Sequence, residues 1–174
     1  MYQLWGGGAP FAPTADPDVL LDAAGATVTL CGNTRQILRE IRTNERWRAI
    51  DAKVAYVSCT DEPSWADECL RKFTLGPARG DGGGGDGAGS AATTLKECGD
   101  YEEIYKSNKK THFTRLQKKT GVAFEDMIFF DNEKHNCTSV SQLGVVCVHC
   151  RGGLSPSVWQ QGIEKFTKSK GEAQ

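Results

Sequence analysis

The sequence predicts an α/β fold of Rossmann-like type, in which helices cover both faces of a parallel sheet. Short β-branched or apolar runs suited to buried strands occur at 54–57, 127–130 and 145–149. Amphipathic segments with helix-capping residues lie between these runs. Hydroxyl or acidic side chains directly follow the first two runs, at the edge where open α/β sheets bind ligands.

Length and composition narrow the class of protein. A chain of 174 residues is long enough for one domain with its own core, so a single domain over 1–174 is expected. Lys plus Arg number 21 and Asp plus Glu 22, so no net field attracts nucleic acid or an anionic membrane. The lack of a spanning run or signal peptide predicts a cytoplasmic protein. The seven scattered cysteines do not have the pattern of a disulfide framework in a small secreted protein. Most of them are expected to be buried thiols.

The first elements of the chain are weakly marked. Glycine and proline without periodicity predict a loop over 1–16. Asn33 is placed to cap a helix that runs to about Trp47 and has one apolar face. The run 54–57 follows as the first strand of the predicted sheet.

A strand end, a helix start and a change of composition come next. Ser58 and Cys59 follow the strand, and Asp61 is placed to cap a helix with Pro63 in its first turn. From 76 to 92 the chain is rich in glycine, which predicts a flexible insertion. A phosphate loop is not expected there, because it needs a fixed turn into a helix and usually a lysine.

The second half carries stronger signals. Lys110 or Thr111 opens a helix that Gly121 closes in the usual C-terminal position. The strand 127–130 follows and ends at Asp131.

The last three elements complete the alternation. A helix to about Leu143 leads into the strand 145–149. Ser155 then caps a final helix, and Pro156 takes its first turn.

Three features leave structural alternatives open. Asp131 could simply cap the following helix. Cys147 and Cys150 form a CxxC unit, but on an extended strand they face opposite sides, which favours buried thiols. His112 and His135 are expected to cap or decorate helices and to have no catalytic role.

Ser58, Lys109 and Asp131 can meet at one edge of the predicted sheet. A hydroxyl, an ammonium and a carboxylate that holds a cation would there converge on one phosphoryl group. The sequence therefore predicts phosphate chemistry at this edge.

At these residues the chain resembles the haloacid dehalogenase (HAD) superfamily, and more narrowly its small, capless magnesium-dependent phosphatase-1 family. The similarity covers nearly everything from Leu30 onward except the glycine-rich insertion. The segments that carry it are Lys109 to Leu116, Lys119 to Gly121, Met127 to Glu133, Leu143 to Val145 and Gln161 to Phe166.

The resemblance implies a Mg2+-dependent phosphatase that hydrolyses phosphate monoesters, of phosphotyrosine or phosphosugar type, through an aspartyl-phosphate. The partner would be a small phosphorylated substrate or a phosphoprotein, and the chain a monomer.

The resemblance also assigns residues one by one. Ser58, Cys59 and Lys109 would bind the substrate phosphate, with Cys59 standing where an arginine is usual. Lys109 would also be catalytic, by offsetting negative charge. Asp131 and Asn132 would hold the metal.

One departure from the family concerns the nucleophile. In the family two aspartates end the first strand, but here Met1 stands in place of the second, so the first strand and its catalytic pair are expected to be missing. The chain as written should therefore be weak or inactive. The alternative is a non-catalytic pseudophosphatase or phosphate-binding module.

Overall fold

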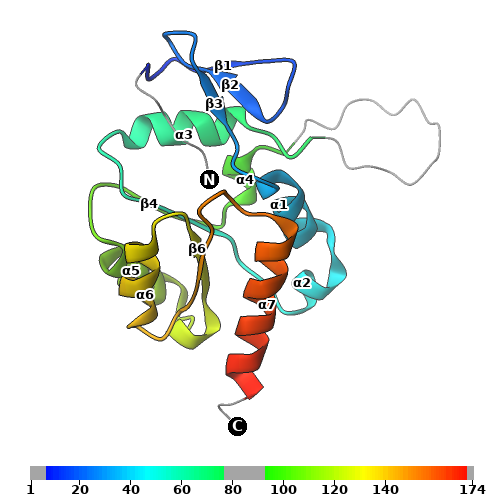
Figure 1. Ribbon diagram of the computed structural model, residues 1–174, viewed down its shortest axis with the longest axis vertical. Coiled ribbons are helices and arrows are strands. Elements are labelled where there is room, and N and C mark those ends of the chain that lie inside the picture. Colours follow the sequence, from blue (N-terminus) through cyan, green and yellow to red (C-terminus); the bar gives the residue numbers. More distant parts are fainter. Residues whose placement is uncertain (1–6, 77–92, 172–174) are drawn as a thin grey trace, which may run out of the picture.

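The computed structural model describes residues 7–76 and 93–171. Four parallel strands in two pairs position the candidate site (Figure 1). Strand β4 (Ala55–Ser58) pairs with β5 (Tyr101–Ile104), and β6 (Ile128–Asp131) pairs with β7 (Val146–His149). The predicted α/β class is confirmed. The single predicted sheet is instead two separate two-stranded parallel sheets in the described chain.

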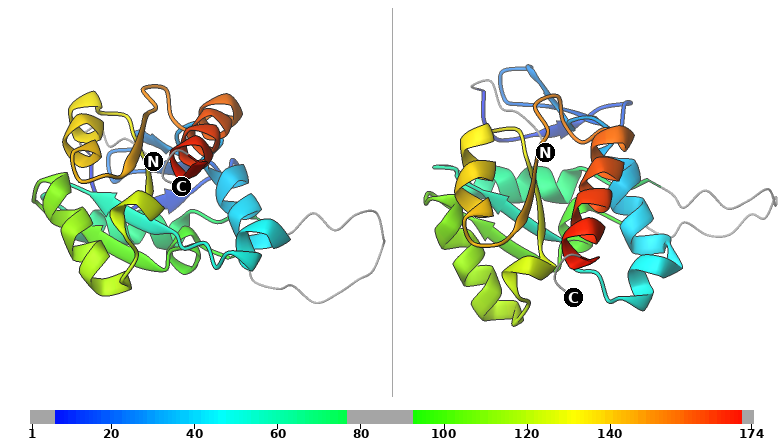
Figure 2. Two further views of the ribbon diagram at one scale, coloured as in Figure 1. Left: turned by 90° about the horizontal axis from the view of Figure 1, so that it is seen from below. Right: turned by 60° about the horizontal axis from the view of Figure 1, so that its bottom comes forward.

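Helices flank the parallel strands on both sides, as predicted (Figures 1 and 2). α5 and α6 pack together on one side, while α7 packs on β7 from the other and lies beside α1. The helices are α1 (Thr34–Thr43), α2 (Glu45–Ala49), α3 (Pro63–Lys72), α4 (Leu95–Cys98), α5 (Lys109–Thr120), the 3-10 helix η1 (Phe124–Asp126), α6 (Lys134–Ser141) and α7 (Pro156–Gly171). None of these described helices is long and apolar enough to cross a bilayer.

An antiparallel sheet near the start of the chain was not predicted. It consists of β1 (Ala12–Pro13), β2 (Val19–Leu21) and β3 (Thr27–Thr29) in that order. The central residues Leu20 and Val28 are buried while their strand neighbours are more exposed, so this sheet covers the core with one face. The predicted loop over 1–16 was therefore wrong at β1, and its residues 1–6 lie outside the described residues.

The first predicted helix is broken in two at Asn44. Asn44 has an extended backbone, and its side chain accepts a hydrogen bond from the Arg46 N–H. It thereby ends α1 and caps α2, because a side chain that satisfies a free N–H favours a new helix start. Asn33 precedes α1 as expected, but its side chain makes no capping hydrogen bond.

Local capping signals fixed most of the other helix ends. Asn108 accepts from the Thr111 N–H and starts α5 at Lys109, slightly before the predicted start. Gly121 ends α5 in the left-handed conformation at φ 72°. Ser155 caps α7 by accepting from the Val158 N–H.

One further expectation was corrected, two elements were not predicted, and one expectation falls mostly outside the described residues. α3 starts at Pro63 with Glu62, not Asp61, as its N-cap residue. α4 and β5 were not predicted. The predicted glycine-rich insertion at 76–92 lies, except for Gly76, outside the described residues.

Two apolar clusters form the core. The larger packs β2 and β3 against α3 and α4 around Phe73, Leu70 and Leu95. The smaller joins α5, β6 and α6, with the Phe113 and Phe129 rings 4.9 Å apart between centroids. This second cluster fixes the start of α5 beside the end of β6, where the candidate site lies.

Replacing Gly121 should test the helix stop. Gly121→Ala is expected to lower the free energy of unfolding by about 1–2 kcal/mol, because alanine disfavours the left-handed backbone. The control is Gly152→Ala, since Gly152 also has open space around it but is not left-handed. Urea denaturation of both variants measures the difference, and equal losses would contradict this explanation.

Candidate phosphate and metal site

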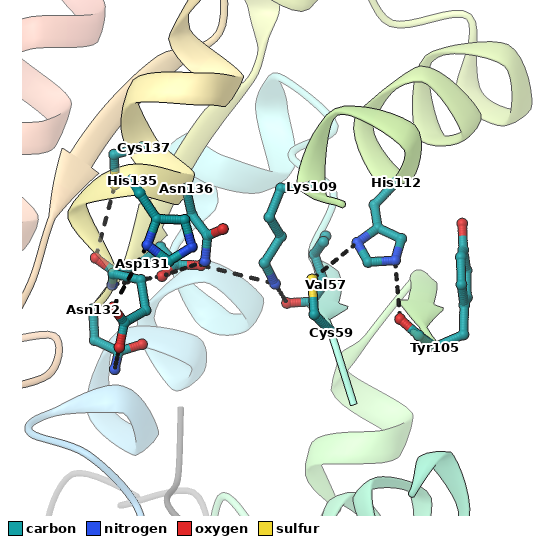
Figure 3. Close-up of polar contacts among 11 residues, drawn as sticks. Val57, Cys59, Tyr105, Lys109, His112, Asp131, Asn132, His135, Asn136 and Cys137 are labelled. Carbon is teal, nitrogen blue, oxygen red and sulfur yellow. Dashed lines mark hydrogen bonds and ion pairs between the residues drawn. The ribbon is translucent and has the colours of Figure 1, made fainter. Parts of the chain in front are cut away.

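Lys109 lies between the two parallel strand pairs (Figure 3). Only 6% of its side chain is exposed, and its Nζ donates to the Val57 carbonyl oxygen at 2.7 Å. The same Nζ is 3.8 Å from Asp131 Oδ2. Val57 belongs to β4 and Asp131 ends β6, so one ammonium group joins the two pairs at their carboxyl edge.

The geometry of parallel strands explains why the Val57 carbonyl is available. The carbonyls of Val54 and Ser58 accept from the chain at either end of β5. Because successive carbonyls of a strand point to opposite sides, the Val57 carbonyl faces away from β5. The Lys109 ammonium takes the place that an N–H of another strand would have.

The electrostatics of Lys109 follow from its burial. Loss of solvent lowers the pKa of the Lys109 ammonium, while the nearby Cys59 and Asp131 partly oppose this effect. The lysine is therefore a buried cation whose charge depends on acceptors in the site.

Asn136 orients the Asp131 carboxylate. Its Nδ2 is 3.2 Å from both carboxylate oxygens, and the Glu133 N–H donates to Oδ1 at 2.7 Å. Asp131 is not the N-cap of α6, since Glu133 has that position, so this structural alternative was wrong. Sequence analysis missed Asn136, although its place in the first turn after Asp131 is a usable signal.

A cavity of about 640 Å³ opens beside Lys109. The start of α5 and the first turns of α6 contribute most of its wall. Residues that line it include Cys59, Asn108, Lys109, Lys110, Glu133 and Asn136. Two lysines and a helix N-terminus make this wall suitable for an anion.

The other predicted site residues differ in how they are placed. Cys59 lies on the cavity wall and is exposed, as the predicted phosphate-binding role requires. Ser58 ends β4 in register with Ile104 and is half-buried. The Asn132 side chain lies 3.5 Å from Glu133, and its described contacts do not include Asp131. The roles of Cys59, Ser58 and Asn132 all remain predictions.

His112 is a correction to the sequence analysis. It is completely buried, with Nδ1 4.0 Å from Cys59 Sγ and Nε2 3.2 Å from the Tyr105 carbonyl oxygen. It therefore neither caps nor decorates α5. Burial, followed by the charge of Lys109, lowers the pKa of His112.

The positions expected for His135 and for most of the cysteines were confirmed. His135 is exposed on α6 beside Glu133. All seven cysteines are free thiols, and Cys147 and Cys150 are both buried.

Comparison with known proteins identifies the family. A profile of the family described as Acid Phosphatase matches residues 1–169. The chain belongs to the acid phosphatase family. The predicted resemblance to the HAD superfamily is confirmed as well.

Two relatives of this acid phosphatase family member are informative. Magnesium-dependent phosphatase 1 of Homo sapiens is 49% identical over 70 residues, which are 40% of this chain and 40% of the human protein. A HAD-like hydrolase superfamily protein of Schizosaccharomyces pombe is 28% identical over 138 residues, 79% of this chain and 70% of that protein. The match thus spans less than half the length of the human relative.

The donors around Asp131 fit a hard cation only in part. Asp131 offers a carboxylate oxygen, the kind of ligand that Mg2+ prefers. However, Asn136, Glu133 and Lys109 already contact this carboxylate. Across 7–76 and 93–171 no group of three or more acidic, histidine or cysteine side chains is arranged to hold a metal. In this acid phosphatase family member, water and phosphate oxygens would have to complete the coordination.

Removing the Asn136 amide should show whether it positions Asp131. Asn136→Ala is expected to lower the free energy of unfolding by about 1.5 kcal/mol, because a buried carboxylate loses its donor. Asn132→Ala is the matched control and should cost less than about 0.5 kcal/mol. An equal loss from Asn136→Ala in an Asp131→Ala background, measured by urea denaturation, would refute the positioning role.

The Lys109 ammonium should give a pH-dependent stability. Its folded pKa is lowered from 10.5, so above the folded pKa the unfolded chain binds more protons and stability rises with pH up to about 10.5. The unfolding free energy of the wild type minus that of Lys109→Met should therefore increase as pH rises from 7 to 10.5. A difference that stays constant or falls in urea titrations would show that the pKa is not lowered.

Proposed function

We propose that this acid phosphatase family member binds phosphate monoesters together with Mg2+ at the carboxyl edge of β4 and β6. The observation that carries the proposal is that the buried Lys109 ammonium, which lines a cavity of about 640 Å³, lies 3.8 Å from the Asp131 carboxylate. A cation and a fixed carboxylate at one strand edge suit a phosphate and its metal.

In this proposal, several residues contribute to binding the phosphate. The Lys109 ammonium offsets the charge of the phosphate, and Lys110 in the first turn of α5 lines the same cavity. Cys59 lies on the cavity wall, and Ser58 precedes it at the strand end. Because Cys59 replaces the arginine usual in the family, the phosphate loses a bidentate contact and should bind more weakly.

Asp131 is the proposed anchor of the cation, with the Asn132 amide as a second donor. When bound, Mg2+ would neutralise charge on the phosphate oxygens. The human relative is named as a magnesium-dependent phosphatase, which supports this choice. Asn136 keeps the carboxylate in position for this role.

Hydrolysis by the family's route needs a carboxylate nucleophile and a second carboxylate as acid and base. The described side-chain contacts of Lys109 and Asp131 include no second carboxylate that could take these roles. We therefore expect the 174-residue chain to bind phosphate esters and to turn them over weakly. Phosphotyrosine and phosphosugar esters are the proposed substrates, and a cytoplasmic monomer the proposed form.

A phosphate-binding module without turnover is the second candidate. One observation favours it: within residues 7–76 and 93–171, no group of three or more acidic, histidine or cysteine side chains is arranged to hold the metal. The two candidates differ in one measurement, the hydrolysis of a generic aryl phosphate in the presence of Mg2+.

Calorimetric titration with inorganic phosphate tests the binding site. Lys109→Met should weaken binding at least about tenfold, the loss of roughly 1.4 kcal/mol, because it removes the buried cation. Lys118→Met on the exposed side of α5 is the matched control and should leave the affinity unchanged. Omitting Mg2+, or replacing Asp131 with Asn, should also weaken binding. Equal affinities for all these proteins would contradict the proposal.

Hydrolysis is tested with two forms of the chain. The chain as written should show little turnover of the aryl phosphate, whereas a form preceded by an apolar strand that ends in two aspartates should gain Mg2+-dependent activity. Turnover by the chain as written that Lys109→Met abolishes would refute the expected weakness. Inactivity of the extended form would favour the binding module.

A further inference from the structure

Cys59 and His112 form a pair whose proton transfer has no role in the proposed phosphate chemistry (Figure 3). Cys59 is the exposed cysteine on the cavity wall, directly after β4. His112, in α5, is completely buried, and its Nδ1 is 4.0 Å from the Cys59 sulfur. A thiol that solvent reaches therefore faces a ring nitrogen that solvent does not reach.

The Tyr105 backbone fixes the tautomer of His112. The carbonyl oxygen of Tyr105 is 3.2 Å from Nε2, and a carbonyl only accepts, so Nε2 carries the hydrogen. In the neutral ring Nδ1 is then bare and can accept the Cys59 proton. The Tyr105 ring packs edge-on against the imidazole at 4.4 Å between centroids and holds its orientation.

We propose that Cys59 and His112 form a nucleophile–base pair, oriented by the Tyr105 carbonyl, which makes Cys59 a modification site for small peroxides. The arrangement has the three parts that activate a thiol, namely the nucleophile, an adjacent base and a group that orients the base. It goes beyond the proposed phosphate function and does not depend on it.

The chemical step balances with hydrogen peroxide as the oxidant. His112 Nδ1 takes the Cys59 proton, and the thiolate attacks one peroxide oxygen. The S–O bond forms as the O–O bond breaks, so sulfur loses two electrons and the peroxide gains them. The departing hydroxide takes the proton from the imidazolium and leaves as water. The product is a sulfenic acid at Cys59 and a neutral His112.

Charged groups around the pair act differently on the thiol and on the imidazole. Lys109, one turn before His112 in α5, interacts electrostatically with Cys59 and would stabilise its thiolate. Arg115 on the same helix, and Glu103 and Tyr105 from β5 and the residue after it, also face His112. Burial and Lys109 keep the imidazole neutral, which is the form that accepts a proton.

The other cysteines provide a contrast within the same molecule. Burial raises the pKa of Cys69 to about 12, of Cys137 to about 11 and of Cys147 to about 12, which makes them poor nucleophiles. Cys98 and Cys150 are also buried. Cys31 is half-buried and serves as the internal reference thiol.

The test is the rate of sulfenic acid formation at each cysteine. The folded chain is treated with hydrogen peroxide and dimedone at pH 7, and labelled peptides are counted by mass spectrometry. Cys59 should react roughly ten times faster than Cys31, because an adjacent base assists it. Rates within about twofold of each other would overturn the proposal.

His112→Gln tests the base directly. It should bring the Cys59 rate down to about that of Cys31, while His149→Gln, an exposed histidine outside the cavity wall, should leave it unchanged. An unchanged Cys59 rate in folded His112→Gln would overturn the proposal. Circular dichroism verifies that the variant is folded.

The pH dependence of the wild type keeps the test decisive if His112→Gln does not fold. The oxidation rate of an unassisted thiol falls about tenfold for each pH unit below its ordinary pKa of roughly 8.5. The oxidation rate of Cys59 should instead stay constant as pH falls, until His112 is protonated. The Cys59 to Cys31 rate ratio should therefore rise several-fold from pH 8 to 7. A Cys59 to Cys31 rate ratio that stays constant over this pH range would overturn the proposal.

Discussion

The buried ammonium of Lys109 is the contact on which the site depends. A charge taken out of water is costly unless acceptors surround it, and here the acceptors come from two different strand pairs. The Val57 carbonyl belongs to β4 and the Asp131 carboxylate to β6. Because the two pairs share no strand ladder in the described chain, this side chain links them at the edge of the candidate site.

Helix α5 brings two kinds of chemistry to the same cavity. Lys109 and His112 are three residues apart, so they lie on one face of the helix and both are buried against the strands. In the two proposals the lysine supplies positive charge for a phosphate, and the histidine accepts a proton from Cys59. The proposed phosphate site and the proposed thiol site therefore share a wall, and a change at Cys59 alters what the phosphate meets.

The sequence predictions were accurate where a structural feature depends on neighbouring residues, and less accurate where it depends on residues far apart in the sequence. Gly121 and Ser155 act through neighbouring residues, and their helix ends were predicted correctly. β5 was missed because its inward residue is Glu103, which the pattern reads as exposed. In the fold Lys119 and the Tyr105 hydroxyl satisfy this buried carboxylate. β1 was missed because two residues show no period.

The sequence by itself determined the α/β class, the family and the position of Asp131 at a strand end, and it placed a helix start just after Lys109. These are local patterns, readable from spacing and capping. Only the tertiary structure decided that His112 meets Cys59, 53 residues away, and that Lys109 reaches Val57, 52 residues away. Periodicity tells which face of a helix is buried, but the partner on that face depends on how distant elements pack.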